Sequence, residues 1–413
     1  MSNELPKDTF FWGAASSAHQ VEGGNTNDDS WLLEHVAGSR YRMSSGDACD
    51  HFNRYREDLA ILRDLGLDSY RFSVEWSRIE PADGEFSDVA LRHYASVVAA
   101  CVELGLRPIV CLHHFTTPLW LMRMGGWECE RMPERFARFV ERTARALGDR
   151  VSAYITINEA NFAWFCRVAG VHPPDDEFRR AEWWTRAAAQ LGILPQDFSP
   201  FCFTATERSR AITLESHRRA VDVLKRLAPH VPRGLSLLVQ DVHSRPGGEA
   251  LAESSRTLMH GIYLDSLRAA EGDDFVGVQN YGRMVFHETG AERPSPPTCQ
   301  IGLEIYPQGL GGAIRDVWRA TKLPILVSEN GIATEVDSER IAYIRESLNS
   351  IDECVAQGID VRGYLHWSIM DNFEWTFGFE PKMGLCSVDR STMARSPKPS
   401  ARWLGSEATR RRG

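Results

Sequence analysis

The sequence predicts an α/β fold, a single (β/α)8 TIM barrel with long loops after its strands. Eight short apolar runs alternate with segments of helical periodicity, and this alternation is typical of a barrel of parallel strands. The length of 413 residues suits one such barrel with inserted loops. No glycine-rich phosphate loop follows the first run, which argues against a doubly wound open sheet.

Each expected strand is a short run of mostly apolar residues bounded by glycine, proline or polar residues. Such runs are typical of strands buried on both faces of a parallel sheet. We place strands at 10–16, 69–74, 107–112, 151–157, 235–241, 274–281, 324–328 and 361–367.

The expected helices show apolar residues at helical spacing and end on glycine. Leu59, Leu62 and Leu65 fall on one face of the first long helix, and Gly66 ends it. The last barrel helix carries Ile341, Ile344, Leu348, Ile351 and Val355 at spacings of three and four residues. The other expected helices are 89–104, 133–147, 209–227 and 307–320.

We assign one domain, residues 1–404, because the chain shows no internal repeat and no low-complexity linker. Residues 405–413 contain three consecutive arginines and almost no apolar residue, and we expect a disordered C-terminal tail there. Residues 162–205 are irregular and read as a long loop with short helices. Trp183 and Trp184 either pack that loop or line a binding site, and the sequence leaves both readings open.

Composition excludes several classes of function. A net charge of −9 argues against a nucleic-acid partner. The sequence contains no run of 18 apolar residues, so we expect no membrane-spanning helix. The nine cysteines show no metal-binding or disulfide spacing, and the N-terminal residues do not resemble a signal peptide. We therefore expect a cytoplasmic protein without metal or cofactor, whose oligomeric state the sequence leaves open.

Two of the expected strands end on a glutamate. The run 324–328 leads into Glu329, and the run 151–157 leads into Asn158 and Glu159. Ligands of α/β barrels bind at the carboxyl ends of the strands, and an unpaired glutamate cannot stay in the core. Only a closed fold can bring two glutamates so far apart in sequence together, and a pair of carboxyl groups is the minimum apparatus for cleaving a glycosidic bond.

Several strand-end motifs extend this pattern. They are FFWGAASSAHQVEGG, SYRFSVEWSRIEP, CLHHFTTPLW, ITINEAN, FVGVQNY, IYPQGL, ILVSENGIAT and YLHWSIMDNFEW. In this order they resemble the motifs of glycoside hydrolase family 1, from about Phe10 to Asp389. The resemblance implies a (β/α)8 fold and a retaining β-glycosidase that needs no cofactor.

The resemblance also implies roles for individual residues. Glu329 matches the nucleophile and Glu159 the acid/base, while Asn158 matches the residue that holds the sugar 2-hydroxyl. Arg71 and Tyr281 match the pair that keeps the nucleophile ionised and aimed. The expected sugar contacts are the hydroxyl readers Gln20, His114, Glu374 and Trp375 and the stacking platform Trp367.

Some of these residues also have a plain structural reading. Arg71 would otherwise be an ion-pair partner in the barrel floor, and His114 a hydrogen-bonded core histidine. We interpret His113 as structural, and Glu22, Glu75 and Glu80 as members of structural ion pairs.

The chain also departs from the usual family pattern. Ala160 stands in place of proline, Phe115 in place of tryptophan and Gln279 in place of asparagine. The segment 376–379 also differs from its commonest form in the family. We expect these departures to affect which leaving group the protein prefers and not the chemistry of the reaction.

The sequence therefore predicts an exo-acting β-glycosidase that removes terminal β-D-glucosyl residues, with β-galactosyl and β-fucosyl residues as further candidates. A transglycosidase that passes the sugar to an alcohol would use the same residues. A sugar-binding pseudoenzyme is the alternative of another class, and retention of both glutamates with Arg71 and Tyr281 argues against it. The expected partner is a small-molecule glycoside.

Overall fold

The computed structural model describes residues 10–270 and 272–412. Its centre is a closed barrel of eight parallel strands in the order β1-β11-β10-β7-β5-β4-β3-β2, as the alternation of strands and helices predicted. Our expectation about a signal peptide concerns the N-terminal residues, of which residues 1–9 lie outside the described ranges. The barrel strands are β1 (Phe11–Ala15), β2 (Ser69–Ser73), β3 (Arg107–Cys111), β4 (Ala153–Ile155), β5 (Arg233–Leu238), β7 (Phe275–Asn280), β10 (Ile325–Asn330) and β11 (Val361–Trp367).

The barrel strands are buried on both faces because side chains fill the inside and helices cover the outside. Ile109, Ile155, Phe275 and Leu326 belong to the cluster inside the barrel, while the larger outer cluster joins strands to helices. This two-sided burial explains why the strands read as continuous apolar runs rather than as alternating patterns.

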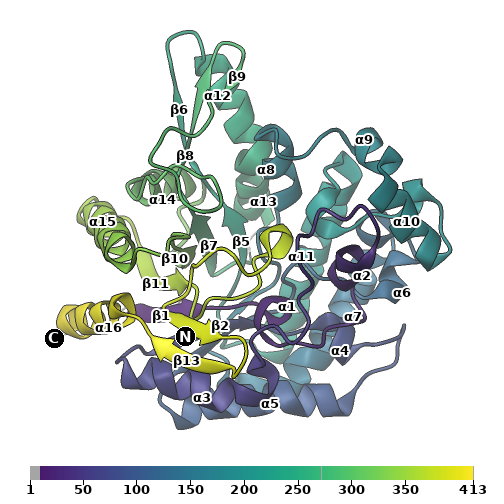
Figure 1. The fold of residues 1–413 in the computed structure, drawn as a ribbon, viewed down its shortest axis with the longest axis horizontal. Coiled ribbons are helices and arrows are strands. Elements are labelled where there is room, and N and C mark those ends of the chain that lie inside the picture. Colours follow the sequence, from purple (N-terminus) through teal and green to yellow (C-terminus); the bar gives the residue numbers. More distant parts are fainter. Residues whose placement is uncertain (1–9, 271, 413) are drawn as a thin grey trace.

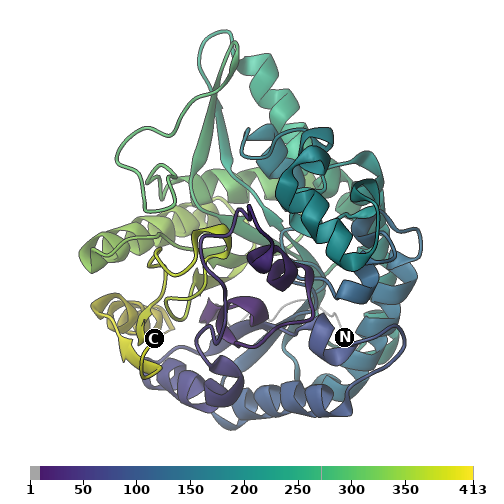
Figure 2. The ribbon, with the colours of Figure 1, turned by 45° about the vertical axis from the view of Figure 1, so that its right-hand side comes forward.

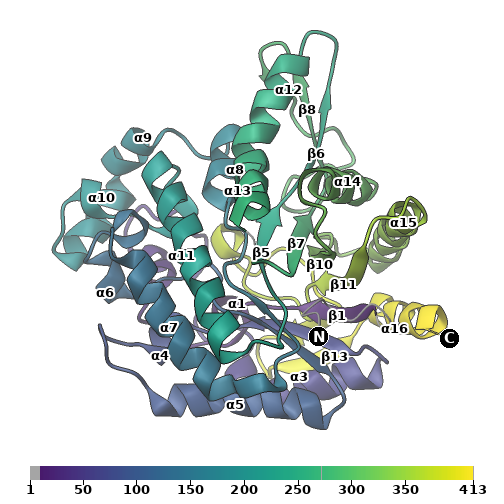
Figure 3. The same cartoon turned by 180° about the vertical axis from the view of Figure 1, so that it is seen from behind.

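Helices that alternate with the strands surround the barrel. Figure 3 shows α7 and α11 on one side of the barrel, α14, α15 and α16 on the other, and α5 along the bottom. Their apolar faces pack on the strands, and their ends follow the glycine and proline signals of the sequence. The helices are α3 (His51–Asp64), α5 (Asp88–Glu103), α7 (Met132–Leu147), α11 (Glu207–Leu227), α13 (Ile262–Ala270), α14 (Gly309–Thr321), α15 (Asp337–Ala356) and α16 (Pro399–Arg412).

The loops after the strands carry further small elements. In Figure 1 a three-stranded sheet of β6, β8 and β9 projects from the barrel beside α12. In Figure 2 the purple segment that includes α1 and α2 crosses in front of the barrel, and Arg42 N donates to Thr376 O at 3.2 Å in the loop after β11. The bounds are α1 (Ala18–Val21), α2 (Asp29–His35), α4 (Trp76–Ile79), α6 (Leu119–Met122), α8 (Phe162–Val168), α9 (Asp175–Arg180), α10 (Glu182–Leu191), α12 (Glu249–Arg256), β6 (Asp241–Ser244), β8 (Arg283–His287), β9 (Gly290–Ala291), β12 (Cys386–Asp389) and β13 (Ala394–Pro397).

The expected disordered tail is wrong for residues 405–412. These residues continue α16, in which Leu404, Gly405 and Ala408 are buried. The backbone of Gly405 lies so close to the Leu65 carbonyl that a side chain at position 405 would clash. Small residues therefore make this contact, and a sequence without large apolar residues still forms a packed helix. Within the described ranges no helix is long and apolar enough to cross a membrane.

The irregular segment 162–205 folds into α8, α9 and α10. Trp183 and Trp184 are buried and surround Phe178, at ring-centroid distances of 5.5 and 5.8 Å. The two tryptophans therefore pack the loop, which decides between the two readings that the sequence left open.

Candidate active site

Glu329 lies near the carboxyl end of β10, where the register against β7 shifts after Val327. Arg71, in β2, donates from Nη1 to Glu329 Oε1. The Tyr281 hydroxyl, just after β7, donates to Glu329 Oε2 at 2.6 Å. Both carboxylate oxygens thus accept hydrogen bonds, one from β2 across the barrel and one from the end of the adjacent strand β7, which fixes the direction in which the carboxylate points.

Glu159 lies in the turn that follows β4, and its backbone is left-handed with φ of 40°. A non-glycine residue adopts this conformation only where its surroundings enforce it. The Glu159 amide donates to Ser236 Oγ at 3.2 Å. Two residues on, Asn161 Nδ2 donates to the carbonyls of Leu238 and Met259, both at 2.8 Å. These bonds hold the turn and direct the Glu159 carboxyl into the barrel mouth.

The two glutamates differ in their electrostatic surroundings. Burial and the negative charge of Glu329 raise the pKa of Glu159 well above its usual range. Burial also raises the pKa of Glu329, but the charge of Arg71 and hydrogen bonds from Tyr281 and Arg71 lower it again. The arrangement therefore favours a proton on Glu159 and a charge on Glu329.

Asn158 connects the two sides of the site. Its Oδ1 accepts hydrogen bonds from Arg71 Nη2 and from Gln279 Nε2, the latter at 2.7 Å. Its Nδ2 lies 3.2 Å from His114 Nε2. The side chain of Asn158 is completely buried and is fixed by residues on β2 and β7 and by His114 just after β3, so it is suited to hold a substrate hydroxyl in one position.

A second group of expected residues gathers at the loop after β11. Gln20 Nε2 donates to Glu374 Oε2 at 3.2 Å and to the Phe373 carbonyl at 2.8 Å. The rings of His114 and Trp367 stack with centroids 5.7 Å apart. Burial and the charge of Glu329 raise the pKa of Glu374 to about 8. Glu374 therefore carries a proton near neutral pH before substrate binds.

The expected site residues meet around one cavity of about 310 Å³. Arg71 and Gln20 lie outside its wall, because Arg71 is buried behind Glu329 and Asn158 and Gln20 is buried behind Glu374. The other expected residues line it, namely His114, Asn158, Glu159, Tyr281, Glu329, Trp367, Glu374 and Trp375.

Much of the cavity wall was not anticipated from the sequence. Most of these residues come from α8 and from irregular loops, where no strand-end rule applies. The aromatic residues of the segment 162–205 were the one available signal. The unanticipated wall residues include Arg40, Tyr41, Phe162, Phe165, Cys166, Val171, His172, Cys202, Phe203, Leu238, Gln240, Ile301, Leu303, Thr376, Phe377 and Met383.

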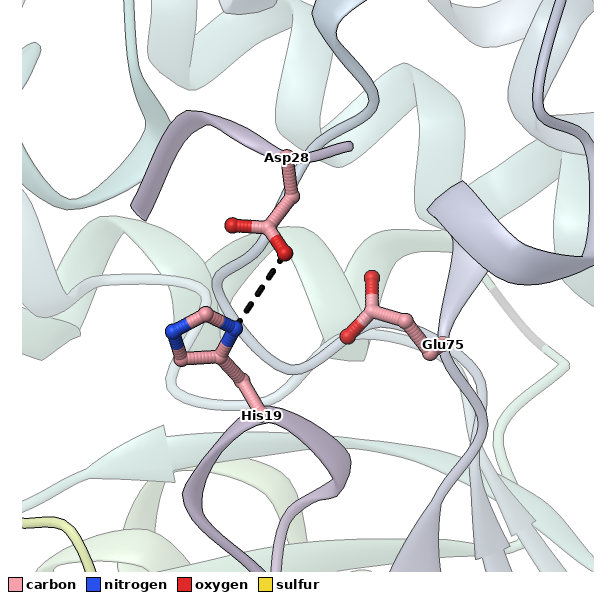
Figure 4. A group of neighbouring side chains, drawn as sticks. All are labelled: His19, Asp28 and Glu75. Atoms are coloured by element: carbon pink, nitrogen blue, oxygen red, sulfur yellow. Dashed lines mark hydrogen bonds and ion pairs between the residues drawn. The ribbon is translucent and has the colours of Figure 1, made fainter. Parts of the chain in front are cut away.

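His19, Asp28 and Glu75 form a buried cluster (Figure 4). One ligand atom from each falls within 4.8 Å of the others, and this is the group among the described residues that could hold a metal ion. In the structure His19 bridges Asp28 at 3.2 Å and Glu34 at 2.7 Å, and these carboxylates raise the pKa of its imidazole. The His19 ring also stacks on Trp375 at 5.7 Å, so the cluster supports an aromatic wall of the cavity.

Of the residues that we interpreted as structural, all except Glu75 make contacts of the expected kind. Glu22 pairs with Arg78 at 2.9 Å, and Glu80 pairs with Arg138. Glu75 instead accepts hydrogen bonds from the Thr116 hydroxyl at 2.9 and 3.1 Å. His113 is enclosed by aromatic rings, and burial lowers its pKa to about 3.

A closed barrel with two buried glutamates of unequal pKa at its strand ends has the architecture of a glycoside hydrolase. The sequence model of glycosyl hydrolase family 1 matches residues 1–240 and 270–412. The chain belongs to glycosyl hydrolase family 1 and is an O-glycosyl hydrolase.

Proteins similar to it include β-glucosidases and β-glycosidases. The chain is 30% identical to thermostable beta-glucosidase B of Thermobispora bispora, covering 98% of this chain and 91% of that one. It is 29% identical to beta-glucosidase A of Thermotoga maritima, covering 95% of each. Among solved structures, the beta-glycosidase BGL167 is 46% identical with a TM-score of 0.95, over 98% of this chain and 97% of that one.

Proposed function

We propose that the protein is a retaining exo-β-glucosidase in which Glu329 is the nucleophile and Glu159 the acid/base. The observation that carries this assignment is the unequal environment of the two carboxyl groups. Both oxygens of Glu329 accept hydrogen bonds, from Arg71 and Tyr281, whereas burial and the charge of Glu329 favour a proton on Glu159.

The reaction then proceeds in two steps. Glu329 attacks the anomeric carbon while Glu159 gives its proton to the leaving oxygen, and a glycosyl-enzyme forms. Esterification removes the charge of Glu329, so the pKa of Glu159 falls and its carboxylate accepts a proton from the incoming water. Asn158 holds the 2-hydroxyl in both steps, because Arg71 and Gln279 keep its side chain in place.

We assign a β-glucosyl residue to the inner end of the cavity, with β-galactosyl and β-fucosyl residues as further candidates. Glu374 and Gln20 would contact the hydroxyls, and Trp367 would stack on the ring. Hydrolysis is favoured over transfer to an alcohol, since the curated relatives carry names such as beta-glucosidase and 1,4-beta-D-glucan glucohydrolase. All nine cysteines are free, which supports a reducing compartment such as the cytoplasm.

The division of roles is tested with two alanine variants. Glu329→Ala should abolish hydrolysis, and azide should restore turnover to an α-glycosyl azide, because a small anion enters the vacated face. Glu159→Ala should lose most activity on poor leaving groups but still release an activated phenol such as 2,4-dinitrophenol, which needs no proton. Product analysis by NMR and burst kinetics give the readout.

If both variants behaved alike toward the activated substrate, the assignment of the two roles would be wrong. Asn161→Ser serves as a control that loosens the turn of Glu159 without removing a carboxyl group. It should lower activity on both substrate types and show no azide product.

A further inference from the structure

The outer half of the cavity has an apolar wall. Glu159 marks the boundary, since the acid/base faces the leaving group and α8 starts three residues after it. The rings of Phe115 and Phe162 lie 4.9 Å apart across this wall, and Val171 at its rim is 55% exposed. The other apolar wall residues are Phe165, Phe203, Leu238, Leu303 and Phe377.

The polar groups in this outer wall are few and partly engaged. Gln240 Oε1 accepts a hydrogen bond from Asn280 Nδ2 at 3.3 Å. Burial lowers the pKa of His172 to about 3, so its ring is neutral, and it stacks on Phe203 at 5.2 Å. A second sugar ring in this half of the cavity would bury several hydroxyl groups. The wall offers few hydrogen-bond partners in place of the water that these groups lose, and burying a hydroxyl without a partner is unfavourable.

Arg40 is the cationic side chain of this wall. Among the described residues that line the cavity, Arg40 is the one that carries a positive charge, and the carboxyl groups of the wall all belong to Glu159, Glu329 and Glu374 at the inner end. The Arg40 guanidinium lies 5.5 Å from the centre of the Phe178 ring. It forms no ion pair with any described carboxylate, in contrast to Arg42, which pairs with Glu380 at 2.9 Å.

We propose that the preferred aglycone is an aromatic ring that carries a carboxylate at its outer end, with the ring on the apolar wall and the carboxylate on Arg40. This inference rests on the proposed β-glucosidase function and names its substrate class. A guanidinium already packed on an aromatic ring is well suited to a carboxylate, because its planar donors match the two oxygens.

The apolar wall is tested with two substrates that release alcohols of similar reactivity. Benzyl β-glucoside and cellobiose both release an alcohol whose oxygen Glu159 protonates, so the leaving groups differ mainly in how they fit the wall. We expect kcat/KM for benzyl β-glucoside to exceed that for cellobiose by about tenfold or more. Equal values, or a preference for cellobiose, would overturn the aromatic assignment.

The role of Arg40 is tested with a charge-matched pair of substrates. We compare 4-(carboxymethyl)phenyl β-glucoside with its neutral carboxamide, in which the phenols have similar acidity. The wild type should prefer the acid, and Arg40→Gln should lower kcat/KM for the acid by about tenfold and for the amide by much less, because only the acid loses an ion pair. The preference should shrink as salt is added, since Arg40 is exposed.

Arg42→Gln is the matched control, because it removes an exposed charge two residues away that does not line the cavity. Equal effects of the two variants, or no preference for the acid in the wild type, would refute the pairing with Arg40. Full activity on the neutral amide without that preference would overturn the inference but leave the β-glucosidase assignment standing. Lack of activity on every aryl β-glucoside would instead remove the proposed function itself.

Discussion

Glu159 and Glu329 are the same type of side chain, and their neighbours give them opposite tendencies to hold a proton. The difference lies in two contacts: Arg71 and Tyr281 reach Glu329, while the charge of Glu329 acts on Glu159. Arg71 lies on β2 and Tyr281 just after β7, so both are distant in sequence from the two glutamates. At the scale of single residues, the chemistry is therefore set by the closure of the barrel.

The pH dependence of the reaction should follow Glu159. Its raised pKa predicts that activity falls on the basic side only at a pH well above the usual range of glutamate. The profile of kcat/KM for an aryl β-glucoside should therefore be bell-shaped. Glu159→Gln should remove the basic limb for an activated substrate, because no proton is then needed.

Glu374 provides the alternative explanation of a basic limb, since its pKa is raised to about 8. Glu374→Gln should leave a basic limb in place if Glu159 is its source. A limb that disappears in Glu374→Gln and survives in Glu159→Gln would contradict the assignment.

At the scale of elements, the strands were predictable and several connections were not. The strands between 69 and 367 could be found because burial on both faces leaves a continuous apolar run. The sheet of β6, β8 and β9 and the pair of β12 and β13 lie outside the barrel, where pairing depends on distant partners and leaves no such run. The same reason applies to the site: residues directly after a strand were found, and the wall from α8 was not.

Helix α16 was missed because it packs with small residues. Ala408 is completely buried while Arg410 is exposed, so the two positions give a matched test. Ala408→Gln should lower the free energy of unfolding by about 2–4 kcal/mol, since it inserts a polar side chain into a packed contact. Arg410→Gln should change it by less than about 0.5 kcal/mol. Thermal or urea unfolding measures both, and two equal, small effects would contradict a packed helix.

At the scale of the whole molecule, buried histidines control stability in acid. Burial lowers the pKa values of His113, His172 and His366 to about 3, and that of His260 to about 4. Below pH 6.5 these groups bind protons in the unfolded chain but stay neutral in the folded one. Their stabilising effect is present above pH 6.5 and is lost as the pH falls toward 4, at about 1.4 kcal/mol per pH unit for each histidine.

Buried carboxyl groups with raised pKa values, among them Glu75, Glu159 and Glu374, act in the opposite direction. The pKa of Glu75 is raised to about 7 and that of Glu374 to about 8, so the folded chain binds these protons first and gains stability until about pH 4.5. We therefore expect the loss of stability per pH unit to be smaller between pH 6.5 and 4.5, where these carboxyl groups oppose it, than below pH 4.5. Urea unfolding across this range measures the curve.

His260 offers a control for this prediction, because neither ring nitrogen has a hydrogen-bond partner among the described residues. His260→Phe should keep the fold and reduce the loss of stability between pH 6.5 and 4. An unchanged slope would show that His260 does not contribute to it.

The ring of strands closes between the first strand and the last, since β1 pairs with β11 from Phe11 to Ala15. During synthesis Glu159 emerges from the ribosome long before residues 361–367 and Glu329 only shortly before them, and the sheet cannot close until those residues have emerged. Until then β1 and β10 each expose an unpaired edge, the kind of surface that joins other chains. The growing chain thus carries Glu159 for most of its synthesis without an active site, and catalysis begins only when the last strand is in place.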